Sequence, residues 1–588
     1  MSTRLLLLLW LALVACSSGQ RGPSVTTEGA TLAITNVRVF DGERVVPRAT
    51  VLVGSATILA AGPDVQVPAG IEVVDGANRT LLPGLIDAHA HVFDAGQLED
   101  SLAFGVTTVL DMFSMPSAVF PLRDKPAPGR ADVRSAGILA TAPRGHGTEY
   151  GMEIPTLTTP GEAQPFADAR FAEGSDYLKI VFDGGGAYGL KTPTIDVPTL
   201  NALIAAAHAR NKMAVVHIGT YAEAMAAFDG GADGVVHLFR DRAPDPTFGT
   251  QVAAKHGFVT PTLTVLRTLQ GVGSKIGTDP ALGPYLSGAA KTNLAATFPI
   301  RATAAPGAAE RAIALLRDAR VPILVGTDAP NPGTTYGASV HEELELLVAA
   351  GLPATTALAG ATSLAARQFA LPDRGRIAPA QRADLVLVEG DPTTRITDTR
   401  RIVAIWHAGA KFDRVAYQAR ATKPVAKPNA SGVVSDFEDG SLTPRFGPDW
   451  MVSTDSLVNG TSTAKLEVLK APRKALSITG TVVAHQPASW AGALYSPGPS
   501  PFSPIDLSGK RLRFAAKGDG KTYVVMVFAQ SHGRAPLVKS FTPGTELTEH
   551  AFAWAEFDGI DGKDINAILI GAVAPGPFSL VIDDVKLD

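Results

Sequence analysis

The chain has 588 residues, of which 46% are apolar and 18% are charged, and its formal net charge is −4. The nearly balanced charge argues against a nucleic-acid-binding protein, and the high apolar content excludes a globally disordered chain. The single cysteine, Cys16, excludes intramolecular disulfides and zinc sites built from several cysteines. At roughly 100–200 residues per domain, the length predicts about three structural units.

The N-terminus has the pattern of a secretion signal. A short basic segment precedes an apolar run over residues 5–15, which is shorter than the roughly 20 residues that a membrane span needs. The run ends in LVAC at residues 13–16, which resembles a bacterial lipobox and so implies cleavage before Cys16 and its lipidation. We expect a lipoprotein signal peptide over residues 1–16 and a tether over residues 17–30. The protein would then be exported and membrane-anchored, at the periplasmic face or the cell surface; an ordinary signal peptide with an unmodified cysteine is the alternative.

The segments that follow predict a barrel flanked by a smaller β-domain. Short β-like runs in residues 31–82 and 372–415 predict a discontinuous small β-sandwich domain whose two segments pair. Between them, residues 83–371 alternate apolar strands with helical stretches, which is typical of parallel sheets. Eight strands in about 250 residues predict an α/β fold, the (β/α)8 TIM barrel. The expected barrel strands are residues 85–88, 106–110, 133–139, 177–182, 213–216, 234–236, 258–262 and 322–325.

The remaining segments predict a lid, a linker and a third unit. The interval over residues 266–320 is too long for one helix, and we expect it to carry a lid over the barrel mouth. Residues 416–432 are rich in proline, alanine and lysine, which indicates a linker. Residues 433–588 consist of short strands and turns, which predict a separate all-β sandwich.

Histidine and aspartate follow four of the apolar strands. The motif DAHAH at residues 87–91 continues the first barrel strand, and His217, His237 and Asp328 end three later strands. Residues two apart in an extended backbone point to the same side, so both histidines of the motif face one place. Barrel enzymes hold their sites at the C-terminal ends of the strands, and buried polar groups there need partners. The recurrence predicts a shared metal centre.

Lys179 lies in the middle of the expected strand over residues 177–182. A buried lysine is costly unless it is paired or neutralised. Burial and nearby cations lower the pKa of such an amine, which leaves a nucleophile able to capture carbon dioxide. The resulting carbamate is an anion with two oxygens and would bridge two metal ions. A snorkelling or ion-paired lysine is the alternative.

These motifs resemble the metal-dependent amidohydrolase superfamily, in particular its imidazolonepropionase-like and metallo-dipeptidase branches. The resemblance covers residues 32–412 and includes LPGLIDAHAH at 82–91, GVTTV at 105–109, GRIAP at 375–379 and ADLVL at 383–387. It implies two divalent ions, one held by His89, His91, Lys179 and Asp328 and the other by Lys179, His217 and His237. Two details depart from the common pattern: residues 54–58 lack the usual acidic-glycine turn, and no acidic residue precedes His237.

A metal centre of this kind predicts hydrolysis. Paired divalent ions lower the pKa of a bridging water, and the hydroxide attacks a carbonyl that one ion polarises. Asp328 would take the proton of that water and pass it to the leaving amine. Zinc fits histidine and oxygen donors best, with manganese or iron as alternatives. We expect cleavage of an amide bond in a dipeptide or N-acyl amino acid, with cyclic amides, lactones and phosphoesters as alternative substrates.

Two residues are candidate substrate contacts. His146 lies in the turn RGHG at residues 144–147, and the resemblance makes it a candidate for binding the substrate or the transition-state oxygen; a solvated turn residue is the alternative. Tyr221 follows His217 by four residues, and it either reaches the substrate or packs its helix.

The C-terminal unit has a resemblance of its own. DFEDG at residues 436–440, Trp450, and IDDV at residues 582–585 resemble the galactose-binding-like jelly roll of complex I assembly factors. Such modules commonly bind glycans or proteins, although a fold does not determine a function. The alternative hypothesis from another class is therefore a surface lipoprotein that binds a glycan or protein and uses its barrel only as a scaffold. The intact set of ligand-type residues favours the enzyme.

Overall fold

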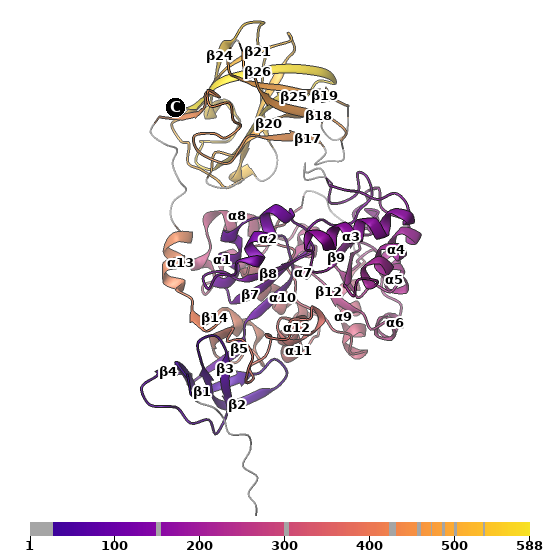
Figure 1. Ribbon diagram of the computed structural model, residues 1–588, viewed down its shortest axis with the longest axis vertical. Helices are drawn as coiled ribbons and strands as arrows, with labels where there is room; N and C mark the ends of the chain where they lie inside the picture. Colours follow the sequence, from indigo (N-terminus) through magenta and orange to yellow (C-terminus); the bar gives the residue numbers. More distant parts are fainter. Residues whose placement is uncertain are drawn as a thin grey trace, which may run out of the picture.

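The computed structural model describes residues 28–148, 154–298, 305–422, 431–455, 460–471, 473–484, 489–498, 502–532 and 536–588. The predicted signal peptide and Cys16 lie outside the described residues. Within the described ranges, none of the helices has both the length and the apolar character needed to cross a membrane. Figure 1 shows a small sheet at one end of the molecule, a barrel-type domain in the middle and a β-sandwich at the other end.

The small sheet joins two segments that are far apart in the sequence. Its strands are β1 (Leu32–Phe40), β2 (Val45–Val53), β3 (Ile58–Gly62), β4 (Glu72–Asp75), β5 (Arg79–Pro83), β13 (Leu385–Glu389), β14 (Ile402–His407) and β15 (Ala410–Lys411). They lie in the order β15-β14-β13-β5-β1-β2-β3, and β4 pairs with β1. β13 runs antiparallel to β5, with Leu385 opposite Pro83. Buried Leu81, Leu385 and Trp406 pack in the same core, so the hydrophobic effect holds the two segments together.

The central domain contains two parallel sheets. One consists of β6 (Leu85–Ala90), β7 (Val106–Asp111) and β8 (Asp132–Ser135), and the other of β9 (Leu178–Val181), β10 (Ala214–His217), β11 (Gly234–Val236) and β12 (Phe258–Thr260). Almost every residue of these strands is buried, as expected for parallel strands covered on both faces.

Hydrogen bonds join the two sheets on both sides. The backbone N–H groups of Ala140 and Val181 connect the segment after β8 to β9, each at 2.8 Å. On the other side, the N–H of Leu324 donates to Val259 and the N–H of Ala88 donates to Val325. The domain is therefore of the TIM-barrel type, with all strand directions parallel.

Two predicted strands are shorter than expected. Residues 322–325 form no strand of their own, only an isolated bridge between Ile323 and Val259. Pro322 lacks an N–H, and the chain turns within three residues of Val325 because Asp328 has a φ of 60°. The expected strand over residues 133–139 ends at Ser135, because Gly137 has a φ of 62° and interrupts the extended backbone.

Helices surround the strands. They are α1 (Ala95–Ala103), α2 (Pro116–Asp124), α3 (Ala163–Glu173), α4 (Val197–His208), α5 (Tyr221–Asp229), α6 (Phe248–Ala254), α7 (Leu263–Thr268), α8 (Gly288–Ala295), α9 (Ala308–Asp318), α10 (Ala338–Ala349), α11 (Ala354–Gly360), α12 (Ser363–Gln368) and α13 (Arg414–Ala421). The interval over residues 266–320 contains the end of α7, then α8 and α9, together with two short 3₁₀ turns.

The predicted linker over residues 416–432 is wrong at its start. Residues up to Ala421 form α13, which packs on the barrel-type domain instead of extending away from it. Tyr417 is buried and donates to Asp100 at 2.8 Å, and Arg414 stacks over the ring of Tyr285. The alanine-rich composition of this segment favours a helix, and one buried aromatic side chain is enough to hold it in place.

The C-terminal unit is a sandwich of two antiparallel sheets. One has the order β18-β19-β26-β21-β24 with β16 paired to β26, and the other has the order β17-β20-β25-β22-β23. Its strands are β16 (Val433–Ser435), β17 (Met451–Thr454), β18 (Thr463–Val468), β19 (Leu476–Val482), β20 (Ala491–Tyr495), β21 (Arg511–Gly518), β22 (Tyr523–Ala529), β23 (Leu537–Phe541), β24 (Thr548–Ala553), β25 (Ile565–Ala572) and β26 (Gly576–Leu587). The all-β prediction for this unit is confirmed.

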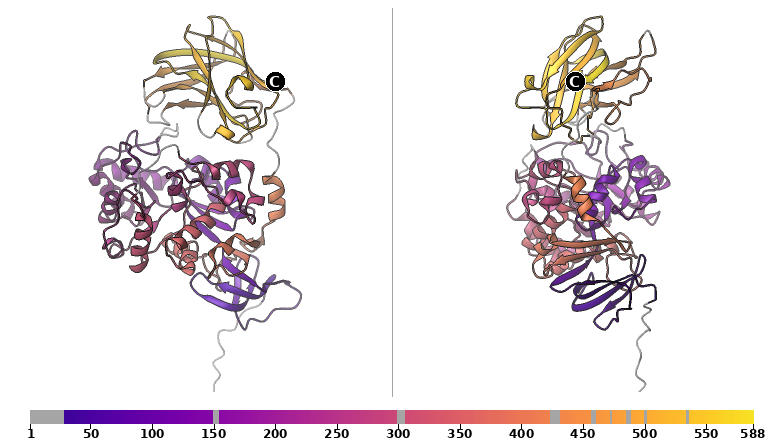
Figure 2. Two further views of the ribbon diagram at one scale, coloured as in Figure 1. Left: turned by 180° about the vertical axis from the view of Figure 1, so that it is seen from behind. Right: turned by 90° about the vertical axis from the view of Figure 1, so that its left-hand side faces the viewer.

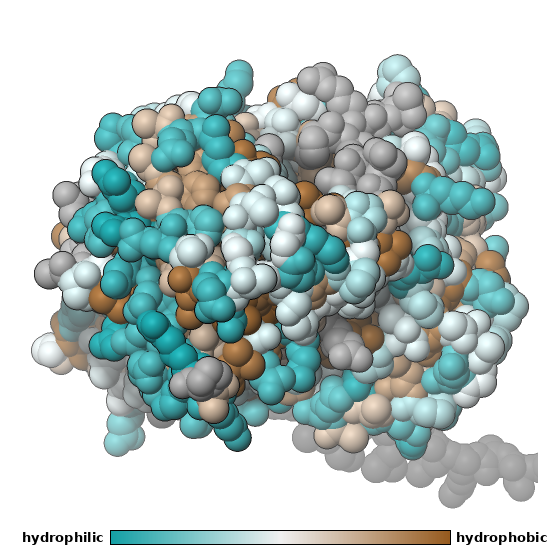
Figure 3. Space-filling view, turned by 90° about the horizontal axis from the view of Figure 1, so that it is seen from above, coloured by the Kyte–Doolittle hydropathy of each residue, from teal (hydrophilic) through white to brown (hydrophobic). Residues whose placement is uncertain are grey.

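The sandwich has a hydrophobic core of its own. Figure 2 shows the sandwich next to the barrel-type domain. α8 of that domain contacts the 3₁₀ turn Gln530–His532 of the sandwich. Viewed from the sandwich end, the surface mixes hydrophilic and hydrophobic residues (Figure 3).

Candidate metal centre

Two histidines and an aspartate meet at the C-terminal end of β6. Nε2 of His89 lies 3.1 Å from Oδ1 of Asp328, and Nε2 of His91 lies 3.0 Å from the same oxygen. These three residues offer ligand atoms that all lie within 4.8 Å of one another. The loop that carries Asp328 is fastened to β6, because the N–H of Asp328 donates to the carbonyl of His89 at 2.7 Å.

Three more histidines extend this group. The ring centroid of His237 lies 4.9 Å from that of His89 and 4.4 Å from that of His217. His217 in turn lies 4.8 Å from His146, which reaches the group from the loop after β8. The structure therefore brings together side chains that the sequence predicted from separate strand ends, and it places His146 beside them.

Two members of the group have an unusual backbone conformation. His237 and Asp328 have φ angles of 69° and 60°, in the left-handed region that non-glycine residues rarely adopt. Such a conformation costs free energy and persists only where the surroundings impose it, as at functional sites. In both cases it turns the chain sharply after an extended segment, which keeps the side chain at the end of the strand.

Lys179 is buried in β9 among these groups. Burial lowers its pKa to about 7, although the charges of Asp328 and Asp111 act in the opposite direction. A substantial fraction of the amine is therefore unprotonated near neutral pH. An amine in this state is a nucleophile, whereas an ammonium ion is not.

His89, His217 and His237 are neutral in this environment. Burial and the charge of Lys179 lower the pKa of His89 well below its usual value. Burial is also the main cause of the lowered pKa of His217 and of His237. Burial alone would raise the pKa of Asp328, but the charge of His89 and hydrogen bonds with His89 and His91 hold it well below its usual range.

This combination fits a divalent metal ion. Metal ligation requires deprotonated ligands, and the site offers neutral imidazole nitrogens next to an ionised carboxylate. Imidazole and carboxylate ligands suit zinc and several other divalent ions. His341 provides the contrast, because both of its ring nitrogens are occupied, by Thr399 at 3.0 Å and the Phe104 carbonyl at 2.9 Å. Nδ1 of His89, by comparison, is buried without a hydrogen-bond partner among the described residues.

Several acidic groups that support the site were missed from the sequence. Asp183 lies beyond the end of β9, and its Oδ2 is 3.1 Å from Nε2 of His217. Asp87 accepts hydrogen bonds from Thr327, including one at 2.6 Å from its hydroxyl, and so ties β6 to the loop before Asp328. Asp111 accepts from the N–H of Val92 at 2.8 Å. A signal for two of them was available, since Asp183 follows the apolar strand β9 and Asp111 ends β7. Asp87 lies within β6, and the sequence showed it only as the first residue of the DAHAH motif.

Tyr221 does not join the group of histidines. Its hydroxyl donates to Asp245 at 3.0 Å, and its ring packs edge-on against Phe239 with centroids 4.9 Å apart. The guanidinium of Arg242 lies over the same ring. These contacts show how the side chain packs at the start of α5.

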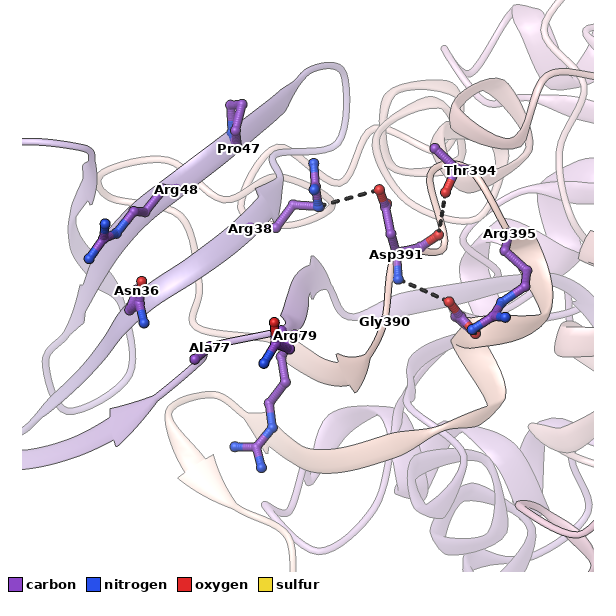
Figure 4. A pocket seen from close by; sticks show the side chains of 12 residues that line it. Asn36, Arg38, Pro47, Arg48, Ala77, Arg79, Gly390, Asp391, Thr394 and Arg395 are labelled. Atoms are coloured by element: carbon purple, nitrogen blue, oxygen red, sulfur yellow. Dashed lines mark hydrogen bonds and ion pairs between the residues drawn. The ribbon is translucent and has the colours of Figure 1, made fainter.

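A hollow of about 710 Å³ on the small sheet is separate from this centre. It is lined by residues of β1, β2 and the loop after β13, and it contains no histidine. Figure 4 shows its charged groups pairing with one another, as Arg38 does with Asp391 at 3.4 Å. The guanidinium groups of Arg48 and Arg79 point in different directions, so they do not converge on one ligand position.

The comparisons with known proteins agree with this geometry. Residues 80–411 match the amidohydrolase family, and residues 436–564 match the family of complex I intermediate-associated protein 30. An imidazolonepropionase from Ruegeria pomeroyi is 28% identical over 400 residues, which are 58% of this chain and 87% of that protein. One from Paracoccus denitrificans is 44% identical over 82 residues, 13% of this chain and 19% of that protein.

Solved structures share the fold of the two N-terminal units. A Xaa-Pro dipeptidase with methionine bound in its active site is 20% identical with a TM-score of 0.52, and the match covers 65% of this chain and 99% of that one. The ochratoxinase of A. niger is 18% identical with a TM-score of 0.52, covering 66% and 96%.

A TIM-barrel-type domain with imidazoles and a carboxylate gathered at its strand ends defines a metal-dependent hydrolase of C–N bonds. The chain belongs to the amidohydrolase family, whose match spans more than half of its length. Its C-terminal unit matches a second family, and the expected superfamily and the expected galactose-binding-like unit are both confirmed.

Proposed function

We propose that this protein is an exported lipoprotein that hydrolyses the amide bond of a dipeptide or an N-acyl amino acid, on a closed (β/α)8 barrel. The observation that carries the proposal is the convergence of His89, His91, His217, His237, Lys179 and Asp328 at the strand ends. His89, His91, Lys179 and Asp328 would hold one divalent ion, and Lys179, His217 and His237 a second. When bound, these ions would lower the pKa of a water molecule and polarise the scissile carbonyl.

Asp328 would move the proton. Its Oδ1 faces the imidazoles of His89 and His91, which leaves Oδ2 to accept a proton from the attacking water. Its lowered pKa means that the carboxylate is ionised before the reaction and is ready to act as a general base. The same oxygen would then donate the proton to the nitrogen of the departing amine, because an amine leaves only when protonated.

His146 would bind the oxygen of the substrate carbonyl. It lies beside His217, and its loop brings the ring to the group of histidines from outside the strands. A ring N–H directed at that oxygen would stabilise the negative charge that develops there in the transition state. Replacing His146 with Asn is expected to lower kcat by about 10²-fold.

We further propose that Lys179 is carbamylated. Its burial, its lowered pKa and its electrostatic effect on His89, His217 and His237 support this modification. The carbamate forms when the unprotonated Nζ attacks carbon dioxide and loses a proton. Carbon-13 NMR of protein loaded with labelled bicarbonate tests it directly: a carbamate signal is expected in the wild type and not in Lys179→Met. A wild-type spectrum without that signal would contradict the modification.

Two substrate classes compete for the same site. The relatives named imidazolonepropionase favour a cyclic amide, whereas the dipeptidase fold favours a linear one. A panel of dipeptides, N-acyl amino acids, cyclic amides, lactones and phosphotriesters, assayed on zinc-, manganese- and iron-loaded protein, separates them. We expect the highest kcat/KM on a linear amide. A higher value on a cyclic amide would replace the proposed substrate but leave the chemistry intact.

Export and anchoring rest on the predicted lipobox. Mass spectrometry of the protein from the membrane fraction is expected to show an N-terminal peptide that begins at a lipid-modified Cys16. Cys16→Ala should appear in the soluble fraction. A Cys16→Ala protein that stays in the membrane fraction after a salt wash would contradict lipid anchoring.

The binding-protein hypothesis is tested by metal content. A chain that uses its barrel only as a scaffold is expected to bind less than one metal ion per molecule after purification. The amide hydrolase is expected to bind about two. Glycan-array or pull-down experiments on the full chain then address a separate ligand of the C-terminal sandwich.

A further inference from the structure

A buried arginine three residues after His237 donates one hydrogen bond from its guanidinium to the described residues. Arg240 lies just beyond β11, and it is only 6% exposed. Nη1 donates to the carbonyl of Leu266 at 2.8 Å. Nη2 is buried and has no hydrogen-bond partner in the described part of the chain. No carboxylate of the described residues pairs with this cation.

Each of the other buried arginines of the described chain has a carboxylate or an aromatic ring against its guanidinium. Arg374 pairs with Asp132 at 2.8 Å and with Asp373 at 2.9 Å, and Arg170 pairs with Glu173, although two nitrogens of Arg170 lack a hydrogen-bond partner among the described residues. Arg414 donates to two carbonyls and stacks on the ring of Tyr285, 3.8 Å from its centroid, although its Nη2 also lacks a partner within the described ranges. Burying a charge without a counter-charge is costly, so such a cation is expected where a ligand supplies the anion.

The position of Arg240 places it beside the reacting groups. Tyr188, in the loop after β9, interacts electrostatically with Arg240 and also with Asp328. The partner of Nη1, Leu266, belongs to α7, and the residue just before α7, Thr262, is 2.7 Å from Nδ1 of His237. The backbone of Arg240 is also anchored, since its carbonyl accepts the N–H of Ala305 at 2.7 Å. These contacts hold Arg240 close to the end of β11, where His237 lies.

We infer that Arg240 binds a free carboxylate of the substrate through Nη2 and thereby selects amides that carry a carboxylate next to the scissile bond. This inference rests on the proposed function and narrows it to dipeptides and N-acyl amino acids with an unblocked carboxyl end. A guanidinium suits this task because it stays charged when buried and donates in a fixed geometry. The carboxylate in return supplies the missing counter-charge and an acceptor for Nη2.

The test compares each substrate acid with its carboxamide, which is nearly isosteric but uncharged. Wild-type enzyme is expected to prefer the acid by about 10- to 100-fold in kcat/KM, the range of a hydrogen bond to a charged group. Arg240→Met should abolish this preference, mainly by raising KM for the acid, and should leave kcat/KM for the carboxamide nearly unchanged. Arg240→Lys keeps the charge and should retain part of the preference.

The control is Arg210→Met, which removes an exposed arginine that follows α4 and pairs with Asp168 of α3. It should leave both substrates unaffected. Circular dichroism and metal content show whether each variant is folded and loaded with metal. If Arg240→Met does not fold, the ratio of kcat/KM on the acid to kcat/KM on the carboxamide, compared between the wild type and Arg240→Lys, tests the role of Arg240.

The outcomes separate this inference from the proposed function. Equal kcat/KM of the wild type on acid and carboxamide, or an equal loss on both in a folded Arg240 variant, would overturn the role of Arg240 while leaving amide hydrolysis intact. A wild type that cleaves no linear amide, acid or carboxamide, would overturn the proposed function itself and this inference with it.

Discussion

Two polar clusters lie at opposite ends of the barrel strands, and they differ in how their charges are balanced. At the start of β8, Asp132 accepts from Arg374 and Arg382 and lies 3.4 Å from His407. Burial would raise the pKa of Asp132, but the hydrogen bond with His407 and the charges of the two arginines hold it well below its usual range. Each charge in this cluster has a partner of opposite sign.

The metal centre at the other end is built differently. Its histidines and Lys179 all become cationic when protonated, and the carboxylates closest to the histidines are Asp328, beside His89 and His91, and Asp183, beside His217. Burial lowers the pKa of Lys179, and burial together with neighbouring basic groups lowers the pKa of His89, His217 and His237. A cluster that satisfies itself supports the fold, whereas a cluster of largely neutral ligands is stabilised fully only when a cation enters. The difference indicates which end of the barrel performs chemistry.

The largest expected effect comes from removing the centre. In the His217→Ala, Asp328→Ala double mutant, amide hydrolysis should fall by at least about 10³-fold, because a ligand and the general base are both lost. The free energy of unfolding of the metal-free protein should change less, because losing the His217 imidazole relieves the crowding of basic groups whereas losing Asp328 removes their counter-charge. Assays with metal-saturated protein and urea unfolding measure the two quantities. Retained activity would show that this cluster is not the active site.

Breaking the opposite cluster should have the reverse effect. Asp132→Ala removes the carboxylate that Arg374 and Arg382 share and leaves each guanidinium only its second carboxylate, Asp373 or Asp384, so we expect a loss of about 3 kcal/mol in the free energy of unfolding. The activity per folded molecule should stay unchanged. The matched control is Asp168→Ala, whose exposed pair with Arg210 is worth less than about 1 kcal/mol. Equal losses in the two variants would remove the distinction between the clusters.

Acidification should affect this cluster in a defined direction. The pKa of Asp132 is lower in the folded state than in the unfolded state, where it is about 4. Asp132 therefore stabilises the folded protein above about pH 4, and this contribution to the free energy of unfolding is lost as the pH falls below that value.

Glu343 predicts a pH dependence of opposite sign. It is buried in α10 and accepts the N–H groups of Leu263 and Thr264 at 2.8 and 2.7 Å, and burial raises its pKa to about 7. Because the pKa of Glu343 is higher in the folded state than its ordinary value of about 4.5, its contribution to the free energy of unfolding is fully present below pH 4.5 and is lost as the pH rises through 7. At about 1.4 kcal/mol per pKa unit, the loss approaches roughly 3 kcal/mol by pH 8. Urea midpoints of wild type and Glu343→Gln from pH 5 to pH 8 measure it, and the variant should show a flatter profile.

The smallest effect is expected for Tyr221→Phe. The substitution removes the hydrogen bond to Asp245 and keeps the ring packed against Phe239. Stability should fall by about 1 kcal/mol, and kcat/KM should not change. A large fall in kcat/KM at unchanged stability would instead show that the Tyr221 hydroxyl contributes to substrate binding.

Much of the fold could be predicted because apolar patterning is a local property. Buried parallel strands leave continuous apolar runs in the sequence, and a polar residue at the end of such a run stands out. This is how His217, His237 and Asp328 were found. The strand expected over residues 322–325 and the linker expected from residue 416 failed for a related reason. The conformation of the first segment depends on hydrogen-bond partners across the barrel, and that of the second on the burial of Tyr417. Neither contact leaves a local pattern in the sequence.

The sequence by itself determined which residue types end the barrel strands, and with them the class of chemistry, because strand direction alone sends those side chains to one end. Only the tertiary structure decided which groups touch. The pairing of His217 with Asp183 and the approach of His146 to His217 depend on how loops fold back over the strands. Among the described residues no carboxylate pairs with Arg240, and this could not be inferred from its neighbours in the chain, since burial and side-chain pairing are properties of the packed molecule.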